Sequence, residues 1–150
     1  MAIVRVQAAD FDTGAELDAL TRGRRDVGGV ASFTGLVRDF GGSGDAAMTL
    51  EHYPGMTERE LEAIAAEAVQ RWGLQGVLII HRYGRLQPGD RIVLTAAAAA
   101  HRQAAFDACM FLMDWLKTRA PFWKLEETGD ERHWVEAKAS DDDAAAKWAK

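Results

Sequence analysis

Apolar and polar positions recur with two different periods along this chain. Short runs that alternate or stay apolar, bounded by glycine or proline, predict strands, whereas apolar side chains three and four positions apart predict helices. Strands are expected at residues 3–7, 28–38, 48–53, 77–82, 91–97, 122–127 and 132–136, the last two as a hairpin. Helices are expected at residues 13–21, 57–72, 100–119 and 141–148. Because no internal repeat or linker interrupts this mixture, it predicts one α+β domain over residues 1–150 with a mixed or antiparallel sheet.

The helix expected at residues 100–119 is the most informative segment. We expect its interior to be buried, because its apolar side chains recur at helical spacing. These side chains are Phe106, Cys109, Met110, Leu112, Met113, Trp115 and Leu116. His101 and Arg102 stand at its start and Lys117 near its end, and Pro121 enforces the stop. A buried helix with cationic ends indicates a site for an anion.

The helix expected at residues 57–72 carries a start signal. Thr57 and Glu60 have capping-box spacing, in which a hydroxyl and a carboxylate satisfy free backbone N–H groups at a helix start. The spacing therefore predicts that the helix starts at Thr57 and runs to about Trp72.

Length and composition narrow the class of protein. A chain of 150 residues that is 48% hydrophobic suits one core, and a net charge of −5 argues against a general nucleic-acid binder. The start of the chain lacks the apolar run of a signal peptide, and no segment is long and apolar enough to cross a membrane. Cys109 is the only cysteine, so an internal disulfide and a cysteine-based metal site are excluded. A single cysteine without a disulfide partner fits the reducing cytoplasm.

Several familiar sites find no support in the pattern. The acidic run at residues 141–143 is typical of a solvated helix start, and the glycine-rich loop at residues 39–45 lacks the Lys of a P-loop. Cys109 lies within an apolar helix, so we expect an inert core thiol. We expect no bound metal or cofactor. The histidines lack ligand-like spacing with each other; they are His52, His81, His101 and His133.

Lys117 and Lys124 permit two interpretations. Each stands near the end of an apolar element and could simply extend its ammonium into solvent. Alternatively, two lysines that flank one proline corner could converge on a pocket and serve in charge stabilisation or proton transfer. His101 and Arg102 form either a phosphate site at a helix start or a surface arginine beside a hydrogen-bonded histidine. Arg38, beside the glycine-rich loop, leaves the same pair of interpretations open.

Five motifs occur in one order over roughly the whole chain. They are Phe33-Thr34-Gly35-Leu36-Val37-Arg38, Leu50-Glu51-His52-Tyr53-Pro54-Gly55-Met56, Ala100-His101-Arg102 with Ala105-Phe106, Asp114-Trp115-Leu116-Lys117, and Pro121-Phe122-Trp123-Lys124-Leu125-Glu126. In this order the motifs resemble the catalytic (large) subunit family of molybdopterin synthase. The resemblance is specific because five ordered motifs coincide.

The resemblance implies a fold, an activity and partners. The family has an α/β-hammerhead fold and converts cyclic pyranopterin monophosphate into molybdopterin by installing two dithiolene sulfurs, a step of molybdenum cofactor biosynthesis. The sulfur arrives as a thiocarboxylate on the C-terminal Gly-Gly tail of a small ubiquitin-like subunit. Two large subunits form a central dimer with one small subunit at each end. The expected protein is therefore a cytoplasmic sulfurtransferase; the alternative is a non-catalytic pterin- or phosphate-binding module or an interaction module.

The resemblance also assigns residues by position. Lys117 and Lys124 match the catalytic lysines of the family. The matched substrate-binding residues are Leu36, Val37, Arg38, His101, Arg102, Lys117, Lys124, Leu125 and Glu126. Three positions depart from the family pattern. Leu36 stands where some relatives are basic, Asp39 replaces a frequent Asn, and Ala99 replaces a Ser that would cap the long helix.

One helix cannot bring all of these groups to one small pterin. His101 and Lys117 are sixteen positions apart, which is about 24 Å along a helix. We therefore hypothesise that each active site is shared across the dimer, with the two lysines from one large subunit and His101 and Arg102 from its symmetry mate.

Overall fold

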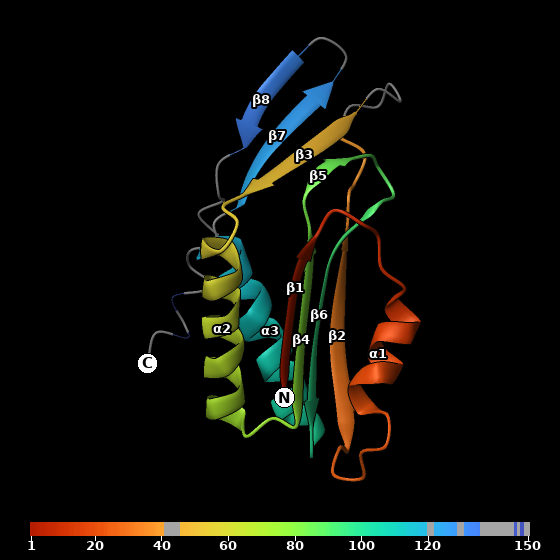
Figure 1. Cartoon of the computed structure of the whole chain (residues 1–150), viewed down its shortest axis with the longest axis vertical. Coiled ribbons are helices and arrows are strands. Elements are labelled where there is room, and N and C mark those ends of the chain that lie inside the picture. Colours follow the sequence, from red (N-terminus) through yellow and green to blue (C-terminus); the bar gives the residue numbers. More distant parts are fainter. Residues whose placement is uncertain (41–45, 120–121, 129–130, 136–145, 147, 149–150) are drawn as a thin grey trace.

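The structure, a computed structural model, describes the chain apart from residues 41–45, 120–121, 129–130, 136–145, 147 and 149–150. Within the described residues, three helices and two four-stranded sheets form an α+β fold (Figure 1). The helices are α1 (Thr13–Thr21), α2 (Met56–Trp72) and α3 (Arg102–Thr118). The strands are β1 (Ala2–Gln7), β2 (Gly29–Leu36), β3 (Ala47–His52), β4 (Gly76–Arg82), β5 (Gly84–Leu86), β6 (Arg91–Ala99), β7 (Phe122–Thr128) and β8 (Glu131–Val135).

The first sheet has the strand order β1-β4-β6-β2 and is mixed. β1 runs parallel to β4, whereas β6 is antiparallel to both of its neighbours. The central strands β4 and β6 are buried over most of their length. β6 ends at Ala99, two residues after its expected end at residue 97. Its last four residues are alanines, although alanine favours helices. Pairing with β2 and β4 on either side outweighs that preference, because it satisfies the backbone of the whole run.

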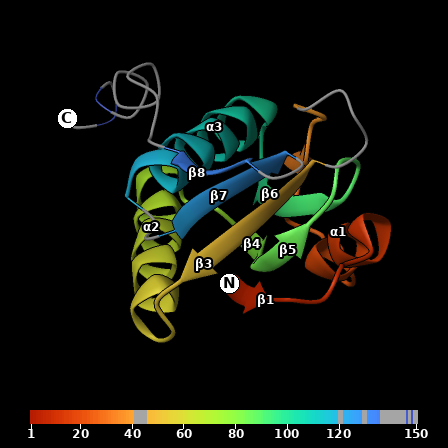
Figure 2. The same cartoon turned by 90° about the horizontal axis from the view of Figure 1, so that it is seen from above.

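Helices cover both faces of the first sheet (Figures 1 and 2). α2 and α3 pack on one face, where Ile64 and Phe111 meet Ile79 of β4. α1 packs on the other face, where Leu20 meets Leu78. Neighbouring residues of β4 therefore contribute to opposite cores, as the alternation of a strand requires.

The second sheet is antiparallel and has the strand order β5-β3-β7-β8. It lies beyond one end of the first sheet, above it in Figure 1. β7 and β8 form the hairpin that the sequence predicts. A small core of Val37, Met48, Leu50 and Leu86 lies under this sheet, and Ile92 of β6 packs against it and against the main core.

Two helix starts differ from the sequence prediction. α2 begins at Met56 with Gly55 as its N-cap, so the expected start at Thr57 is wrong. Glu58, not Glu60, accepts from the Gly55 N–H at 3.3 Å, and the Thr57 hydroxyl accepts from the Tyr53 N–H at 3.0 Å. α3 begins at Arg102 after His101. Ala99 therefore lies in β6, and a serine at this position would not cap the helix.

The burial of α3 also differs from the prediction. Phe106 is 64% exposed and Met110 is 52% exposed, although the apolar pattern placed both in a buried interior. α3 packs on the sheet and on α2 through its other apolar face, which leaves Phe106 and Met110 as an apolar stripe on its outer face. The buried residues of the packed face are Ala105, Ala108, Cys109, Phe111, Leu112 and Leu116. Pro121, most of the loop expected at residues 39–45 and most of the helix expected at residues 141–148 lie outside the described residues.

Candidate active site

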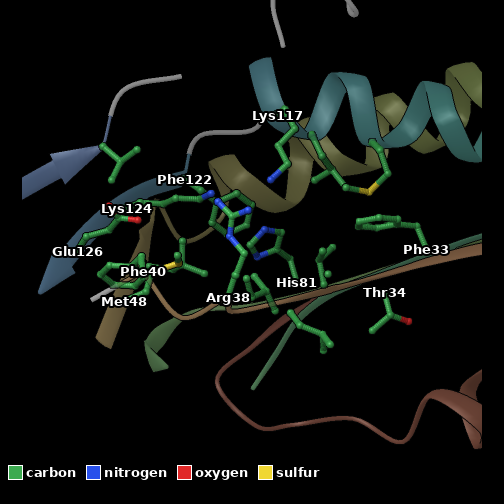
Figure 3. A pocket seen from close by; sticks show the side chains of 18 residues that line it. Phe33, Thr34, Arg38, Phe40, Met48, His81, Lys117, Phe122, Lys124 and Glu126 are labelled. Carbon is green, nitrogen blue, oxygen red and sulfur yellow. The ribbon is translucent and has the colours of Figure 1, made fainter. Parts of the chain in front are cut away.

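A cavity of about 640 Å³ opens where the second sheet meets the C-terminal end of α3 (Figure 3). Apolar side chains from both sheets and from α3 form much of its wall, among them Phe33, Ile92, Met113, Leu116 and Phe122. Apolar surface of this kind lowers the local dielectric constant and so strengthens electrostatic interactions beside it.

Three cationic side chains reach this cavity from different elements. Arg38 follows β2, Lys117 lies in the last turn of α3, and Lys124 lies in β7. Figure 3 shows their side chains gathered near His81 and Phe122. Two lysines that flank one proline in the sequence therefore line a single cavity, as the convergent interpretation predicts. The arrangement suits a ligand with more than one negative group.

Successive residues of β7 point to the cavity and to the opposite face of the second sheet. Lys124 and Glu126 line the cavity, whereas the side chain of Leu125 is buried between them. Glu126 also lies 3.3 Å from Nε2 of His133 on the neighbouring strand β8. Because the side chain of Leu125 points away from the cavity, only its backbone is available to a ligand in the cavity.

The backbone beside Arg38 is fixed by the turn before β6. The Val37 N–H donates to the Asp90 carbonyl at 2.9 Å, and the Gly89 N–H donates to the Val37 carbonyl at 2.8 Å. The Val37 side chain is buried in the core of the second sheet. Leu36, exposed on the other side of the backbone, lines the cavity together with Arg38. Val37 therefore holds Arg38 in place, with its side chain and both backbone groups already engaged.

His101 and Arg102 lie at the opposite end of α3 and do not line this cavity. Fifteen positions separate Arg102 from Lys117, about 22 Å along the helix. The backbone just before His101 packs closely against Gly28, since a Cβ on Gly28 would stand 1.9 Å from the Ala100 carbonyl oxygen. Only glycine fits at position 28, so this contact helps to fix the position of the backbone that leads into His101. Within one chain the structure therefore separates the expected site residues into two groups.

His81 and Phe122 belong to the cavity but were not among the expected site residues. The His81 ring is 9% exposed and stacks on Phe122 with ring centroids 3.7 Å apart. Burial lowers the pKa of His81 to about 4, and the charges of Lys117 and Lys124 add to this effect, although a hydrogen bond to the Arg82 backbone opposes it. The imidazole is therefore neutral near pH 7. The sequence signal was one histidine near the end of an apolar strand, which metal-ligand spacing does not detect.

Comparison with known proteins identifies the family. The family model described as MoaE protein matches residues 6–119. This chain belongs to the MoaE family. Over 147 residues it is 60% identical to the molybdopterin synthase catalytic subunit of Mesorhizobium japonicum, and the match covers 97% of this chain and 92% of that relative.

Solved structures share the fold of this MoaE-family chain. The molybdopterin biosynthesis MoaE protein from Burkholderia ambifaria is 53% identical, with a TM-score of 0.86 over 100% of this chain and 99% of that one. A protein–protein complex of subunits 1 and 2 of the molybdopterin-converting factor from Helicobacter pylori matches at 18% identity. Its TM-score is 0.75 over 90% of this chain and 91% of that one. At that identity the likeness shows the fold alone.

Three further properties of this MoaE-family chain concern its cysteine, its helices and its possible metal ligands. Cys109 is a buried free thiol beside the Thr95 hydroxyl, 3.7 Å away, and burial raises its pKa. No helix among the described residues is long and apolar enough to span a membrane. In the same part of the chain, no three His, Cys, Asp or Glu side chains gather where they could hold a metal ion.

Proposed function

We propose that this chain is the catalytic subunit of a molybdopterin synthase and transfers sulfur to cyclic pyranopterin monophosphate. The convergence of Arg38, Lys117 and Lys124 on one apolar-walled cavity carries this proposal, because the substrate is a phosphorylated heterocycle and the sulfur donor is an anion. Membership of the MoaE family supports it. The sulfur donor is the thiocarboxylate at the C-terminus of a small ubiquitin-like subunit, and two transfers build the dithiolene of molybdopterin.

Substrate binding follows from the side chains that line the cavity. The guanidinium of Arg38 presents paired donors that match the oxygens of the cyclic phosphate. Phe33 and Phe122 offer flat apolar surfaces to the pterin ring. The phosphate and the ring are thereby held by different parts of the wall, which orients the carbon atoms that receive sulfur.

The two lysines act on the charges of the transfer. Their ammonium groups neutralise the incoming thiocarboxylate and stabilise the negative charge that develops as the cyclic phosphate ester opens. An ammonium at hydrogen-bond distance from the departing oxygen also supplies its proton. Because Lys117 and Lys124 come from separate elements, one can face the carrier tail while the other faces the phosphate.

An external sulfur donor agrees with the state of the only cysteine. The Cys109 thiol is buried outside the cavity lining, and its raised pKa keeps it in the unreactive protonated form. The chain therefore offers no thiolate of its own near the three cations.

We also propose that two copies of this chain share each active site. Phe106 and Met110 expose an apolar stripe on α3 that leads, at helical spacing, to Met113 and Lys117 at the cavity. β2 lies at the edge of the first sheet, beside α3. Two-fold packing on this face would bring the N-terminal end of the partner's α3, with its His101 and Arg102, to the cavity.

Mixing two inactive variants tests the shared site. Lys117→Ala and Arg102→Ala proteins are each expected to be nearly inactive as homodimers. After unfolding and joint refolding, mixed dimers contain one site with all of its residues and recover activity. Activity no higher than that of either parent would contradict the shared site.

The proposed assembly adds one small ubiquitin-like subunit with a C-terminal Gly-Gly thiocarboxylate at each end of the dimer. The complex of subunits 1 and 2 of the molybdopterin-converting factor supports a two-subunit enzyme. We propose that residues 1–150 form one large-subunit domain of the α/β-hammerhead class, since Ile92 packs against the cores of both sheets. The proposed compartment is the cytoplasm.

A direct assay tests the function. The purified chain is mixed with thiocarboxylated small subunit and cyclic pyranopterin monophosphate, and the dithiolene product is sought by mass spectrometry. The proposal predicts product that depends on both the chain and the thiocarboxylate. Substrate binding without product would instead indicate a pterin- or phosphate-binding module, and the absence of both would contradict either function.

A further inference from the structure

His81 is the buried titratable group of the cavity to which the proposed reaction gives no role. It lies near the end of the central strand β4, and its ring is nearly parallel to Phe122, at 17°. Burial and stacking together fix the plane of the imidazole. A side chain held this firmly at a cavity wall presents its polar atoms in a defined direction.

The hydrogen bond to Arg82 decides which ring nitrogen carries the proton. Nδ1 lies 2.8 Å from the Arg82 carbonyl oxygen, and because a carbonyl only accepts, Nδ1 is the donor. In the neutral imidazole Nε2 then has a free lone pair. The charged and titratable groups that face the ring are Lys117 on α3, Lys124 on β7 and His52 on β3, and all of them favour the neutral form.

Nε2 is open to a ligand. No described residue hydrogen-bonds to it, yet it is not fully buried. Among the described residues, the fully buried side-chain atoms without a hydrogen-bond partner are Gln75 Oε1 and Trp115 Nε1. His81 itself lines the cavity. One nitrogen is therefore satisfied by the backbone, while the other is an acceptor at the cavity wall that lacks a donor.

We propose that His81 Nε2 accepts a hydrogen bond from an N–H group on the edge of the bound pterin and thereby sets the orientation of the ring. This inference rests on the proposed function. The cationic side chains of the cavity are donors and suit the phosphate and the thiocarboxylate, whereas a pterin edge also carries donors that need an acceptor. Glu126 is the carboxylate of the cavity, and it already faces His133.

A neutral acceptor is suited to this position for an electrostatic reason. A carboxylate between Lys117 and Lys124 would pair with their ammonium groups and reduce the positive charge that the transfer uses. A neutral imidazole accepts a hydrogen bond and leaves both charges available. His81 is thus a substrate-contacting residue for ring recognition and takes no proton in the reaction.

Two replacements separate the acceptor from the packing of the ring. His81→Phe keeps an aromatic ring against Phe122 but removes the acceptor, and we expect its KM for the pterin to rise about tenfold with a much smaller change in kcat. His81→Gln loses the stack but can place an amide oxygen near the position of Nε2, so it should recover most of the lost affinity. The matched control is His52→Phe, because His52 packs at a tilt against Tyr83 outside the cavity lining and should keep the wild-type KM.

The outcomes distinguish this inference from the proposed function. A wild-type enzyme that makes no dithiolene contradicts the function. With an active wild type, a His81→Phe protein of unchanged KM, or a Gln variant as weak as the Phe variant, overturns the role of His81.

Nitrogen-15 NMR of the wild-type chain tests the same contact without a variant and without turnover. The Nε2 resonance of His81 should shift when cyclic pyranopterin monophosphate binds. Binding with an unmoved Nε2 resonance would also overturn the inference.

Discussion

Lys117 and Lys124 reach one cavity from the last turn of α3 and from β7. Replacing either by alanine should lower kcat about 100-fold, because the loss of one group that stabilises transition-state charge typically has an effect of this size. Arginine at the same positions keeps the charge and should retain more activity. Steady-state rates of dithiolene formation measure both effects.

A matched control is Arg85→Ala, which removes an exposed cation of strand β5 outside the cavity lining. Its kcat should equal that of the wild type. Wild-type rates in both lysine variants would contradict a catalytic role for these residues.

Asp10 gives a residue-scale prediction about acid stability. Its carboxylate accepts from the Arg91 guanidinium at 2.8 and 3.0 Å and from the Phe11 N–H at 2.8 Å, and these bonds hold its pKa at about 2, below the usual 3.8. Because the pKa is lower in the folded chain, the carboxylate stabilises the fold above about pH 4, and this stabilisation is lost as the pH falls through about 2.

Asp10→Asn should therefore lower the urea midpoint at pH 7 and match the wild type near pH 2. High salt should reduce the difference at pH 7, since the pair is exposed. Equal midpoints at pH 7 and low salt would show that the ion pair contributes nothing measurable.

The ordered motifs were enough to locate the cations that line the cavity but not the imidazole of His81 beside them. Arg38, Lys117 and Lys124 stand in motifs that the sequence shows directly. The role of His81 depends on a stack with Phe122, more than forty positions away, and on a backbone bond, neither of which has a local sequence pattern. The side chain of Val37 points into the core because its backbone is hydrogen-bonded to the turn at residues 87–90. The sequence shows this turn only as a separate element, so the direction of Val37 could not be predicted.

At the scale of elements, periodicity predicted α1, α3 and the β7–β8 hairpin well, because each has a clear pattern or stop signal. It missed β5, which is only three residues long. It also misplaced the start of α2, since two glutamates stand near the cap and the backbone selects Glu58. Helical spacing identified the apolar positions of α3, but it does not show which of them pack against another element, so the burial of Phe106 and Met110 was predicted wrongly.

Trp148 makes hydrogen bonds to both α2 and α3. Its indole N–H donates to Asp114 of α3 at 2.5 Å, and its carbonyl accepts from Arg71 of α2 at 2.7 Å. The ring also packs edge-on against Trp72 and Phe111. Trp148→Ala should lower the free energy of unfolding by about 2 kcal/mol, measured by urea denaturation.

Trp134→Ala is the control of the same chemistry, because Trp134 of β8 is 54% exposed. It should change stability by less than about 0.5 kcal/mol. If the two variants were equally stable, the contacts of Trp148 would not contribute to the fold.

At the scale of the whole molecule, the exposed stripe of α3 predicts the state of association. Phe106→Glu places a charge on that stripe and should convert a dimer into a monomer in light-scattering measurements, because an unpaired charge is costly to bury. Activity should fall with dimer content, since each proposed site draws on both copies. Trp134→Glu, on the exposed face of β8, should stay dimeric. A dimeric and fully active Phe106→Glu protein would contradict the proposed interface.

The burial of Cys109 has a practical consequence for handling this protein. Its thiol is buried and held in the protonated form, so alkylating reagents such as maleimides should leave the folded chain unlabelled and fully active. A cysteine introduced at the exposed position of Arg85 would then be the only site to accept a dye. Such a singly labelled chain would let fluorescence follow the arrival of a sulfur-bearing partner without any background from the protein's own sulfur.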